Sequence, residues 1–234
     1  MIDDQDKDSR RVVFDTVEQL IRNTLPPELQ TDAARKVLEQ LTKLITQDAT
    51  TGIPNKRAMD DTLEKTLAIA KSYHVEKERR RDAPRKVTFI MIDLDGFKGV
   101  NDNLAIGHAG GDAALRYFAD FMKKHLRPTD SVARMGGDEF GVLMEADETA
   151  AKEIMGRLRK QMAVDPFEYN GVTPPLSFSF GAHEITAQDA NIETIKADAD
   201  SKAYADKAGK HGRLDGFARR VAASRKPGGI SPAP

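Results

Sequence analysis

The chain has 234 residues, 39% of them hydrophobic, which suits one domain with an appendage. Its formal net charge of −1 argues against a large nucleic-acid-binding surface, and the absence of cysteine excludes disulfides and thiol chemistry. No apolar run is long enough to span a bilayer and no signal peptide is recognisable, so a cytoplasmic protein without a membrane partner is expected.

Residues 1–47 predict helices that precede the main domain. A first helix is expected from Val12 to Leu25, where Pro26-Pro27 ends it, and a second from Thr31 or Asp32 to about Gln47. In the second helix, apolar residues recur at steps of four, three and four: Ala34, Leu38, Leu41 and Ile45. This spacing fits a seam for a partner helix and fits packing on the chain's own domain equally well. We interpret residues 1–47 as a helical regulatory or linker segment.

The following segment predicts a long helix from Asn55 onward. One face of that helix carries four apolar residues: Met59, Leu63, Leu67 and Ala70. Beyond it, Glu76 to Arg85 includes the basic run Arg79-Arg80-Arg81. Such a run is usually solvated, so it is interpreted as a helix end and loop.

Val87 to Ile92 is an apolar run in which Thr88 is the one polar residue, and it predicts a strand that is buried on both faces. The run ends at Asp93-Leu94-Asp95. A carboxylate at the end of a buried strand destabilises the fold unless it is paired or bound to a metal ion. Asp93 is therefore expected either to cap the following turn or to ligate a metal.

Two short predicted strands, 131–135 and 140–144, flank the segment Gly136-Gly137-Asp138-Glu139. The Gly-Gly dipeptide favours a tight hairpin turn, which would place both carboxylates just past it. Taken alone, the segment is equally typical of a solvated turn. If Asp93 lies beside it, the site has an excess of negative charge, and its oxygen ligands favour Mg²⁺ or Mn²⁺.

Further helices and strands are expected around these two acidic segments. They are helices over Ala113–Leu126 and Thr149–Met162, a strand over Leu176–Ile185, a last helix from Ile192 to about Ala208, and an edge strand over Leu214–Val221. Gly181 predicts a bulge or bend inside its strand. The end of the chain is rich in Pro and Gly, which predicts a disordered tail over residues 223–234.

Several ordered motifs between residues 48 and 220 resemble one known family. They are Asp48–Arg57, Asp93–Lys98 with Asn101-Asp102, Gly107–Asp112, Met135–Phe140, and the set Asp200, Tyr204 and Lys207. Together they resemble the GGDEF family of diguanylate cyclases, and motifs in this order are far more specific than one short match.

The resemblance implies an α+β fold with a central, mostly antiparallel sheet flanked by helices, as in nucleotidyl cyclase and polymerase palm domains. The catalytic domain would cover residues 48–222. The implied activity is the condensation of two GTP into cyclic di-GMP plus two pyrophosphate. The implied enzyme is a homodimer in which each subunit binds one GTP and two metal ions, Mg²⁺ or Mn²⁺.

The resemblance also implies roles at the acidic clusters. Asp93, the backbone carbonyl of Leu94, and Asp138 would ligate metal, and Asp138 would also help to deprotonate the attacking hydroxyl. Glu139 and Lys98 complete the implied catalytic set.

The triphosphate is implied to lie against two segments. Phe97 and Lys98 belong to the first, where backbone N–H groups and one lysine would contact phosphate. Lys207 belongs to the second and would hold the terminal phosphates. The family places an arginine four residues after this lysine, but His211 stands there. Either Arg213 or Lys210 would therefore take that role.

Asn101 and Asp112 resemble the pair that reads guanine, and His108 belongs to the same substrate-binding segment. An aspartate accepts hydrogen bonds from guanine N1–H and N2–H₂, and an asparagine amide serves O6 or N3. The chain is two residues longer than the family pattern between these two side chains, at Ala105-Ile106. The position of Asp112 relative to Asn101 is therefore left open.

Arg127 and Asp130 resemble the family's inhibitory Arg-x-x-Asp site, since Arg127 lies nine residues before Gly136. The cyclic di-GMP product would bind there, because arginine suits phosphate or a guanine edge and aspartate suits guanine N–H donors. A plain ion pair at a helix end is the other interpretation. For the whole domain, the alternative function is that of a catalytically weak cyclic di-GMP receptor.

Overall fold

The computed structural model describes residues 32–75 and 85–224, with the backbone alone at residues 32–35, 38–39 and 74–75 and from residue 211 onward. The chain divides into two compact units, Met1–Gln47 and Asp48–Pro234. In the first unit, helix α2 spans Asp32–Thr46, as predicted. The expected helix over Val12–Leu25 and the basic run at Arg79-Arg80-Arg81 lie outside the described residues. Of the tail expected over residues 223–234, residues 223 and 224 are the end of a helix and the rest also lies outside the described residues. Within those residues, no helix combines the length and the apolarity needed to cross a membrane.

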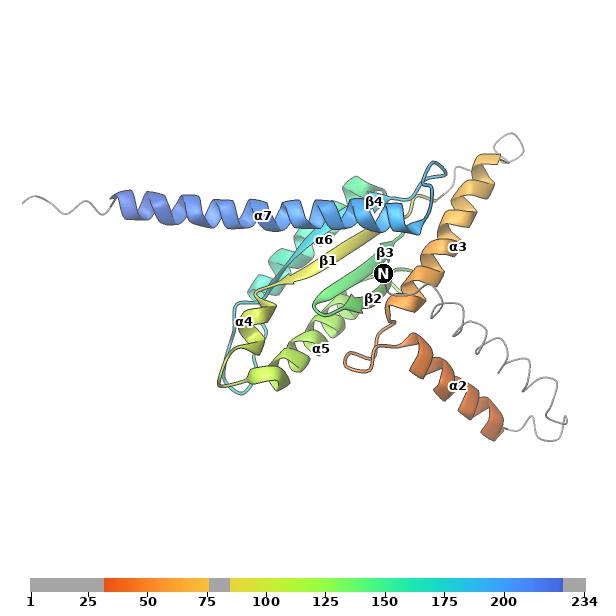
Figure 1. Cartoon of the computed structure of the whole chain (residues 1–234), viewed down its shortest axis with the longest axis horizontal. Coiled ribbons are helices and arrows are strands. Elements are labelled where there is room, and N and C mark those ends of the chain that lie inside the picture. The colour runs from red at the N-terminus through yellow and green to blue at the C-terminus, as the bar shows by residue number, and fades with distance from the viewer. Residues whose placement is uncertain (1–31, 76–84, 225–234) are drawn as a thin grey trace, which may run out of the picture. The chain divides into compact units, whose positions relative to one another are not determined.

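The second unit is built on a four-stranded antiparallel sheet with the strand order β2-β3-β1-β4 (Figure 1). The strands are β1 Thr88–Asp95, β2 Ser131–Gly136, β3 Glu139–Met144 and β4 Ser177–Glu184. Burial is continuous from Thr88 to Ile92, which confirms a central strand covered on both faces. One correction concerns its end: β1 continues to Asp95, because β4 pairs with it as far as Ser177.

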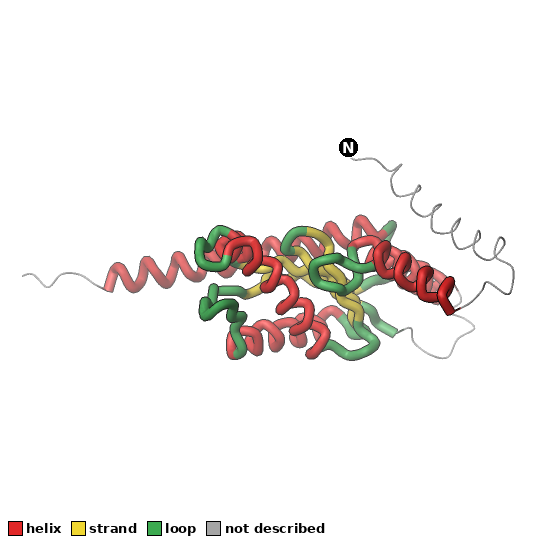
Figure 2. Tube along the Cα trace, turned by 90° about the horizontal axis from the view of Figure 1, so that it is seen from below, coloured by secondary structure: helices red, strands yellow, loops and turns green. Residues whose placement is uncertain are grey.

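Helices cover both faces of this sheet (Figure 2). Ile90, Ile92 and Leu94 of β1 belong to a core cluster with α5 Gly107–His125 and α6 Glu148–Val164. Phe89 and Met91 point to the opposite face and belong to a cluster with α3 Lys56–Val75 and α7 Ile192–Ser224. The two clusters follow from the alternation of side chains along a strand. Met59, Leu63 and Leu67 of α3 are buried, as their spacing predicts.

Gly181 lies in an unbroken stretch of the β1–β4 ladder, opposite Met91, so the expected bulge is wrong. A Cβ atom at this position would lie 2.0 Å from the Ala199 carbonyl oxygen and 2.4 Å from the Ala203 backbone nitrogen. The glycine is needed because the backbone of α7 packs directly against the strand here.

The last helix also differs from expectation. α7 runs from Ile192 to Ser224, so residues 214–221 are helical and the expected edge strand is wrong. Gly209 and Gly212 lie within the helix and do not end it. The final segment contains alanine and arginine, which are good helix formers, and a helix that is already formed extends more easily than a new strand starts.

Candidate functional site

The turn between β2 and β3 is the centre of the site. Gly136 ends β2 with φ 150°, Gly137 follows with φ 50°, and Glu139 begins β3. The turn residues are therefore Gly137 and Asp138, one position later than the Gly-Gly turn that was expected. As a result, Asp138 lies in the turn itself and Glu139 lies in the ladder.

The sheet register brings the two acidic segments together. Asp93 of β1 is the ladder partner of Glu139 of β3. The backbone N–H of Leu94 donates a hydrogen bond to the Asp138 carbonyl oxygen, with an N···O distance of 3.1 Å. The four residues that were expected to form the acidic site are thus held side by side by backbone pairing.

The carboxylates of this site repel one another. Burial raises the pKa of Asp138, and the charge of Asp93 raises it further. Burial also raises the pKa of Glu139, with added contributions from Asp200 and Asp138. Lys207 forms an ion pair with Asp93; burial lowers the lysine's pKa, but the hydrogen bond to Asp93 outweighs this and leaves the pKa raised. The site therefore favours cations.

The donor set fits a hard divalent cation. In the described part of the chain, no cluster of three or more His, Cys, Asp or Glu side chains is arranged to hold a metal ion. The expected ligand set needs only two carboxylates, Asp93 and Asp138, together with the Leu94 carbonyl, and water can complete the coordination of Mg²⁺. These oxygen donors and the raised carboxyl pKa values are consistent with such an ion.

Sequence reasoning missed the residue that braces the turn. The Nε and one terminal nitrogen of Arg134 donate to the Gly137 carbonyl oxygen at 3.0 and 2.7 Å. The other terminal nitrogen contacts both Asp48 carboxylate oxygens at 3.1 Å. Burial opposes ionisation of Asp48, but hydrogen bonds from Thr51 and Arg134 leave its pKa lowered. Asp48 is the first residue of the motif Asp48–Arg57, and Arg134 directly precedes the motif Met135–Phe140. These positions were the signal in the sequence that could have pointed to their role.

The phosphate segment after β1 forms a short helix, α4, over Phe97–Asn101. Gly96 precedes it with φ 82°, and a Cβ there would lie 2.7 Å from the Pro175 carbonyl oxygen, so only glycine fits. Lys98 is exposed and Phe97 is half-buried against the core. The lysine is therefore available to an anion at the end of β1.

Asn101 and the segment of Asp112 lie next to each other despite the longer loop. A Cβ on Gly111 would lie 1.9 Å from the Asn101 Oδ1 atom, so the asparagine side chain rests on that glycine. Asp112 follows directly in α5 and is exposed, and His108 is exposed one turn earlier. Ile106, one of the two additional residues, is buried and fills a small core cluster, so the extension is absorbed within the loop.

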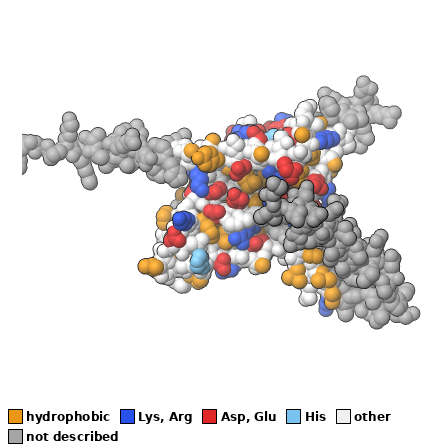
Figure 3. All heavy atoms as spheres, in the orientation of Figure 1, with side chains coloured by type: hydrophobic (Ala, Val, Ile, Leu, Met, Phe, Trp, Pro, Cys, Tyr) orange, Lys and Arg blue, Asp and Glu red, His pale blue; other side chains and the backbone are white. Residues whose placement is uncertain are grey.

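The three basic residues expected to be candidates for phosphate binding near the end of the chain, Lys207, Lys210 and Arg213, all lie on α7, and the first two have described side chains. Lys207 contacts Asp93 at the acidic site. Lys210 contacts Asp95 at 2.7 Å. Arg213 belongs to the part of α7 whose side chains are not described. The face drawn in Figure 3 shows acidic and basic side chains interspersed over this unit.

Arg127 and Asp130 lie at the other end of β2, roughly 17 Å from the turn by the strand rise. The Asp130 carboxylate accepts hydrogen bonds from the backbone N–H groups of Arg127 (3.0 Å) and Glu145 (3.3 Å). The Arg127 side chain makes no ion pair with any residue that the structure describes, and it is exposed. The two residues therefore do not form the simple ion pair that was the other interpretation.

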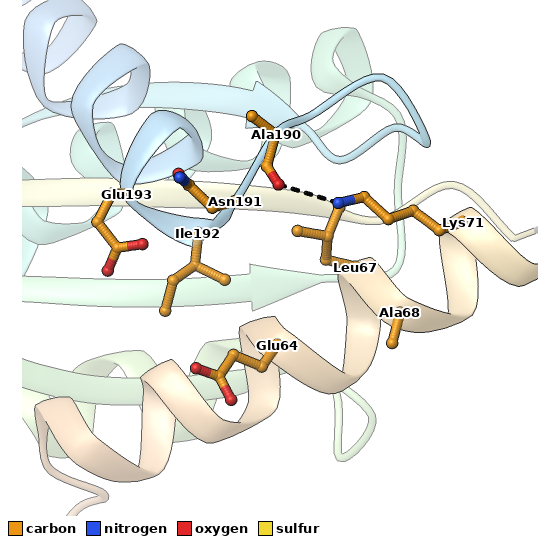
Figure 4. Close-up of a pocket in the computed structure, with 8 residues that line it drawn as sticks. All are labelled: Glu64, Leu67, Ala68, Lys71, Ala190, Asn191, Ile192 and Glu193. Carbon is orange, nitrogen blue, oxygen red and sulfur yellow. Dashed lines mark hydrogen bonds between the residues drawn. The ribbon is translucent and has the colours of Figure 1, made fainter. Parts of the chain in front are cut away.

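A cavity of about 270 Å³ lies between α3 and the start of α7. Figure 4 shows Glu64 on one side and Ile192 on the other, with the Lys71 ammonium donating to the Ala190 carbonyl oxygen at 3.0 Å. None of the expected site residues lines it.

The sequence matches the family described as "Diguanylate cyclase, GGDEF domain" over residues 45–213. It is 35% identical over 180 residues to the diguanylate cyclase DgcP of Pseudomonas aeruginosa, covering 76% of this chain and 24% of that protein. It is 32% identical over 192 residues to the probable diguanylate cyclase DgcE of Escherichia coli (strain K12), covering 82% of this chain and 16% of that protein. The chain thus spans about a sixth to a quarter of the length of these relatives.

A solved structure is also similar to this chain. It is a sensory box/GGDEF family protein from Caulobacter crescentus, with a TM-score of 0.60 and 28% sequence identity, covering 70% of this chain and 99% of that one.

Proposed function

We propose that this chain, which belongs to the diguanylate cyclase GGDEF domain family, condenses two GTP into cyclic di-GMP and releases two pyrophosphate. One observation carries the proposal: the β1–β3 register sets Asp93 and Leu94 beside Asp138 and Glu139 at a braced turn. The test is incubation with GTP and Mg²⁺, followed by chromatographic identification of the products.

Within this proposal, Asp93, the Leu94 carbonyl and Asp138 hold two Mg²⁺ or Mn²⁺ ions. Bound there, the ions supply polarisation of the phosphates and offset the charge that develops during transfer. Lys98 on α4 and Lys207 on α7 bring positive charge to the triphosphate from two sides. Asp138 also helps to deprotonate the attacking hydroxyl.

The proposal includes a homodimer. One domain presents one acidic turn and one Asn101–Gly111 contact, so it holds one GTP, which is half of the reactants. Two domains face each other, and the 3′-OH of each GTP attacks the α-phosphorus of the other. Each attack forms one phosphodiester bond and releases one pyrophosphate.

We expect GTP to be converted and ATP to be left unchanged, because Asp112 accepts from the guanine N–H donors that adenine lacks. Asp112→Ala should raise KM for GTP about ten- to a hundredfold, as expected for the loss of hydrogen bonds to a charged group. Steady-state kinetics with both nucleotides checks this. Conversion of ATP by the unaltered protein would contradict the assignment of Asn101 and Asp112.

Product inhibition is expected to depend on Arg127, whose exposed guanidinium is available to a phosphate of cyclic di-GMP. Arg127→Ala should weaken cyclic di-GMP binding about ten- to a hundredfold in calorimetric titration and leave the initial rate similar. Inhibition should be non-competitive with GTP, because the pair lies at the far end of β2 from the turn.

Arg116→Ala is the matched control, since Arg116 is exposed on α5 away from that end, and it should bind product normally. If the Arg127→Ala variant bound cyclic di-GMP as tightly as the unaltered protein, the assignment of Arg127 to an inhibitory site would be wrong. Binding of cyclic di-GMP without any turnover of GTP would instead identify the domain as a receptor.

A further inference from the structure

The ammonium group of Lys210 donates hydrogen bonds to three oxygen atoms of the sheet. Its Nζ donates to Asp95 Oδ2 at 2.7 Å, to the Phe178 carbonyl oxygen at 2.5 Å and to Ser179 Oγ at 2.8 Å. An ammonium has three N–H donors, and these three acceptors use all of them. A phosphate oxygen could be bound only by displacing one of these contacts.

Asp95 is held equally tightly. One carboxylate oxygen accepts from Lys210, and the other accepts from the hydroxyl of the buried Ser179 at 2.7 Å. Only 17% of the Asp95 side chain is exposed, so loss of its partner would leave a largely buried charge without compensation. Asp95 shares a peptide bond with Leu94, whose carbonyl is expected to ligate metal.

Asp206, one turn before Lys210, provides a second attachment of α7 to neighbouring elements. Its Oδ2 atom accepts from an Arg159 terminal nitrogen at 2.6 Å and from the Phe180 backbone N–H at 3.2 Å, and lies 3.6 Å from Lys210 Nζ. Arg159 comes from α6 and lies over the Phe180 ring, 5.1 Å from its centre. We call Arg159, Asp206, Lys210, Asp95 and Ser179 the α7 clasp.

Lys207 lies on the same turn of α7 as the clasp. It is adjacent to Asp206 in sequence and one turn before Lys210, and it is the residue that contacts Asp93. The clasp therefore fixes both the end of β1 and the helical turn that presents Lys207 to the acidic site.

We propose that Lys210 is a positioning residue, which holds Asp95 and the Leu94–Asp95 peptide in place and does not bind the triphosphate. The inference rests on the proposed cyclase function. Of Lys210 and Arg213, the two candidates for the phosphate-binding position that follows Lys207, it leaves Arg213. A phosphate ligand contributes mainly to substrate binding, whereas a residue that orients the reacting groups contributes mainly to kcat.

A double-mutant cycle tests the contact without relying on catalysis. The free energy of unfolding in urea is measured for Lys210→Met, Asp95→Asn and the double variant. If Lys210 acts through Asp95, the double variant is more stable than the sum of the two single effects implies. Strictly additive effects would overturn the contact on which the proposal depends.

A binding experiment tests the role in the site. The probe is 3′-deoxy-GTP with Mg²⁺, because this nucleotide lacks the attacking hydroxyl and cannot cyclise. Lys210→Met should keep its affinity within about twofold and lower kcat for GTP about tenfold, whereas Lys207→Met should lose affinity at least about tenfold. Lys210→Arg, which keeps a charge for Asp95, should recover part of kcat.

An affinity loss in Lys210→Met that equals the loss in Lys207→Met would overturn the proposal and make Lys210 a phosphate ligand. If the unaltered protein forms no cyclic di-GMP, the proposed function fails. The unfolding cycle and the affinity comparison still decide the role of Lys210 in that case.

Discussion

Asp138→Asn is expected to lower cyclase activity on the order of a hundred- to a thousandfold while raising the melting temperature of the metal-free protein. The loss of activity follows because the amide supplies no negative charge for a divalent cation and accepts no proton. The gain in stability follows because burial and Asp93 disfavour the ionised carboxyl, as its raised pKa shows. Asparagine keeps the shape of the side chain and removes the charge.

The direction of the pKa shift of Asp138 determines how the stability difference between the two proteins depends on pH. A carboxyl whose pKa is higher in the folded state than in the unfolded state destabilises the fold when ionised. The penalty is fully present at neutral pH and disappears as the pH falls through the raised pKa. The melting temperatures of the two proteins in chelator should therefore differ at pH 7 and converge toward acidic pH.

Asp61→Asn is the matched control, since Asp61 is exposed on α3, and it should change neither property. A metal-free Asp138→Asn protein that melts below the unaltered protein would contradict the electrostatic account of the turn.

Gly181→Ala is expected to destabilise the domain by about 3 kcal/mol or more, which corresponds to a fall in melting temperature of roughly 6–12 °C. The added methyl group would meet backbone atoms of Ala199 and Ala203 at 2.0 and 2.4 Å, and backbone cannot move aside as a flexible side chain can. α7 would have to shift away from β4, and Lys207 would move with it. Thermal unfolding measures the first effect, and nucleotide affinity measures the second.

Gly156→Ala provides the comparison, because Gly156 lies in the interior of α6 and an added Cβ would meet no atom within 4 Å beyond its chain neighbours and the backbone of its own helix. That change should stabilise the protein by about 0.5–1 kcal/mol through helix propensity. A Gly181→Ala protein as stable as the Gly156→Ala protein would show that α7 does not pack on β4 as described.

Most of the fold was predictable because its signals are local. The segment from Val87 to Ile92 is rich in β-branched and aromatic residues, which favours a buried strand. Met59, Leu63 and Leu67 are spaced so that they lie on one face of a helix. The closeness of Asp93 and Asp138 was predictable only from the ordered motifs. Neither the segment of Asp93 nor the segment of Asp138 indicates by itself which residues of the two strands pair.

Two of the failures, at Gly181 and Arg134, share a physical cause: the contact that decides the outcome comes from a residue far away in the sequence. Gly181 looks like a bulge residue until α7 is packed on it. Residues 214–221 are an exception, because their apolar residues Leu214, Phe217, Ala218 and Val221 recur at helical spacing and the helix was therefore readable from the segment itself. Arg134 looked like an ordinary strand residue, and its role is visible only once Asp48 and the Gly137 carbonyl lie around it.

The most direct test of the central claim is a product measurement on the unaltered protein and on Asp138→Asn, each incubated with GTP and Mg²⁺. Cyclic di-GMP and pyrophosphate are quantified in the same samples over time. The unaltered protein is expected to form both products, with two pyrophosphate for each cyclic di-GMP, and the variant is expected to form neither at a comparable rate. Equal cyclic di-GMP formation by the two proteins, or none by the unaltered protein, would contradict the central claim.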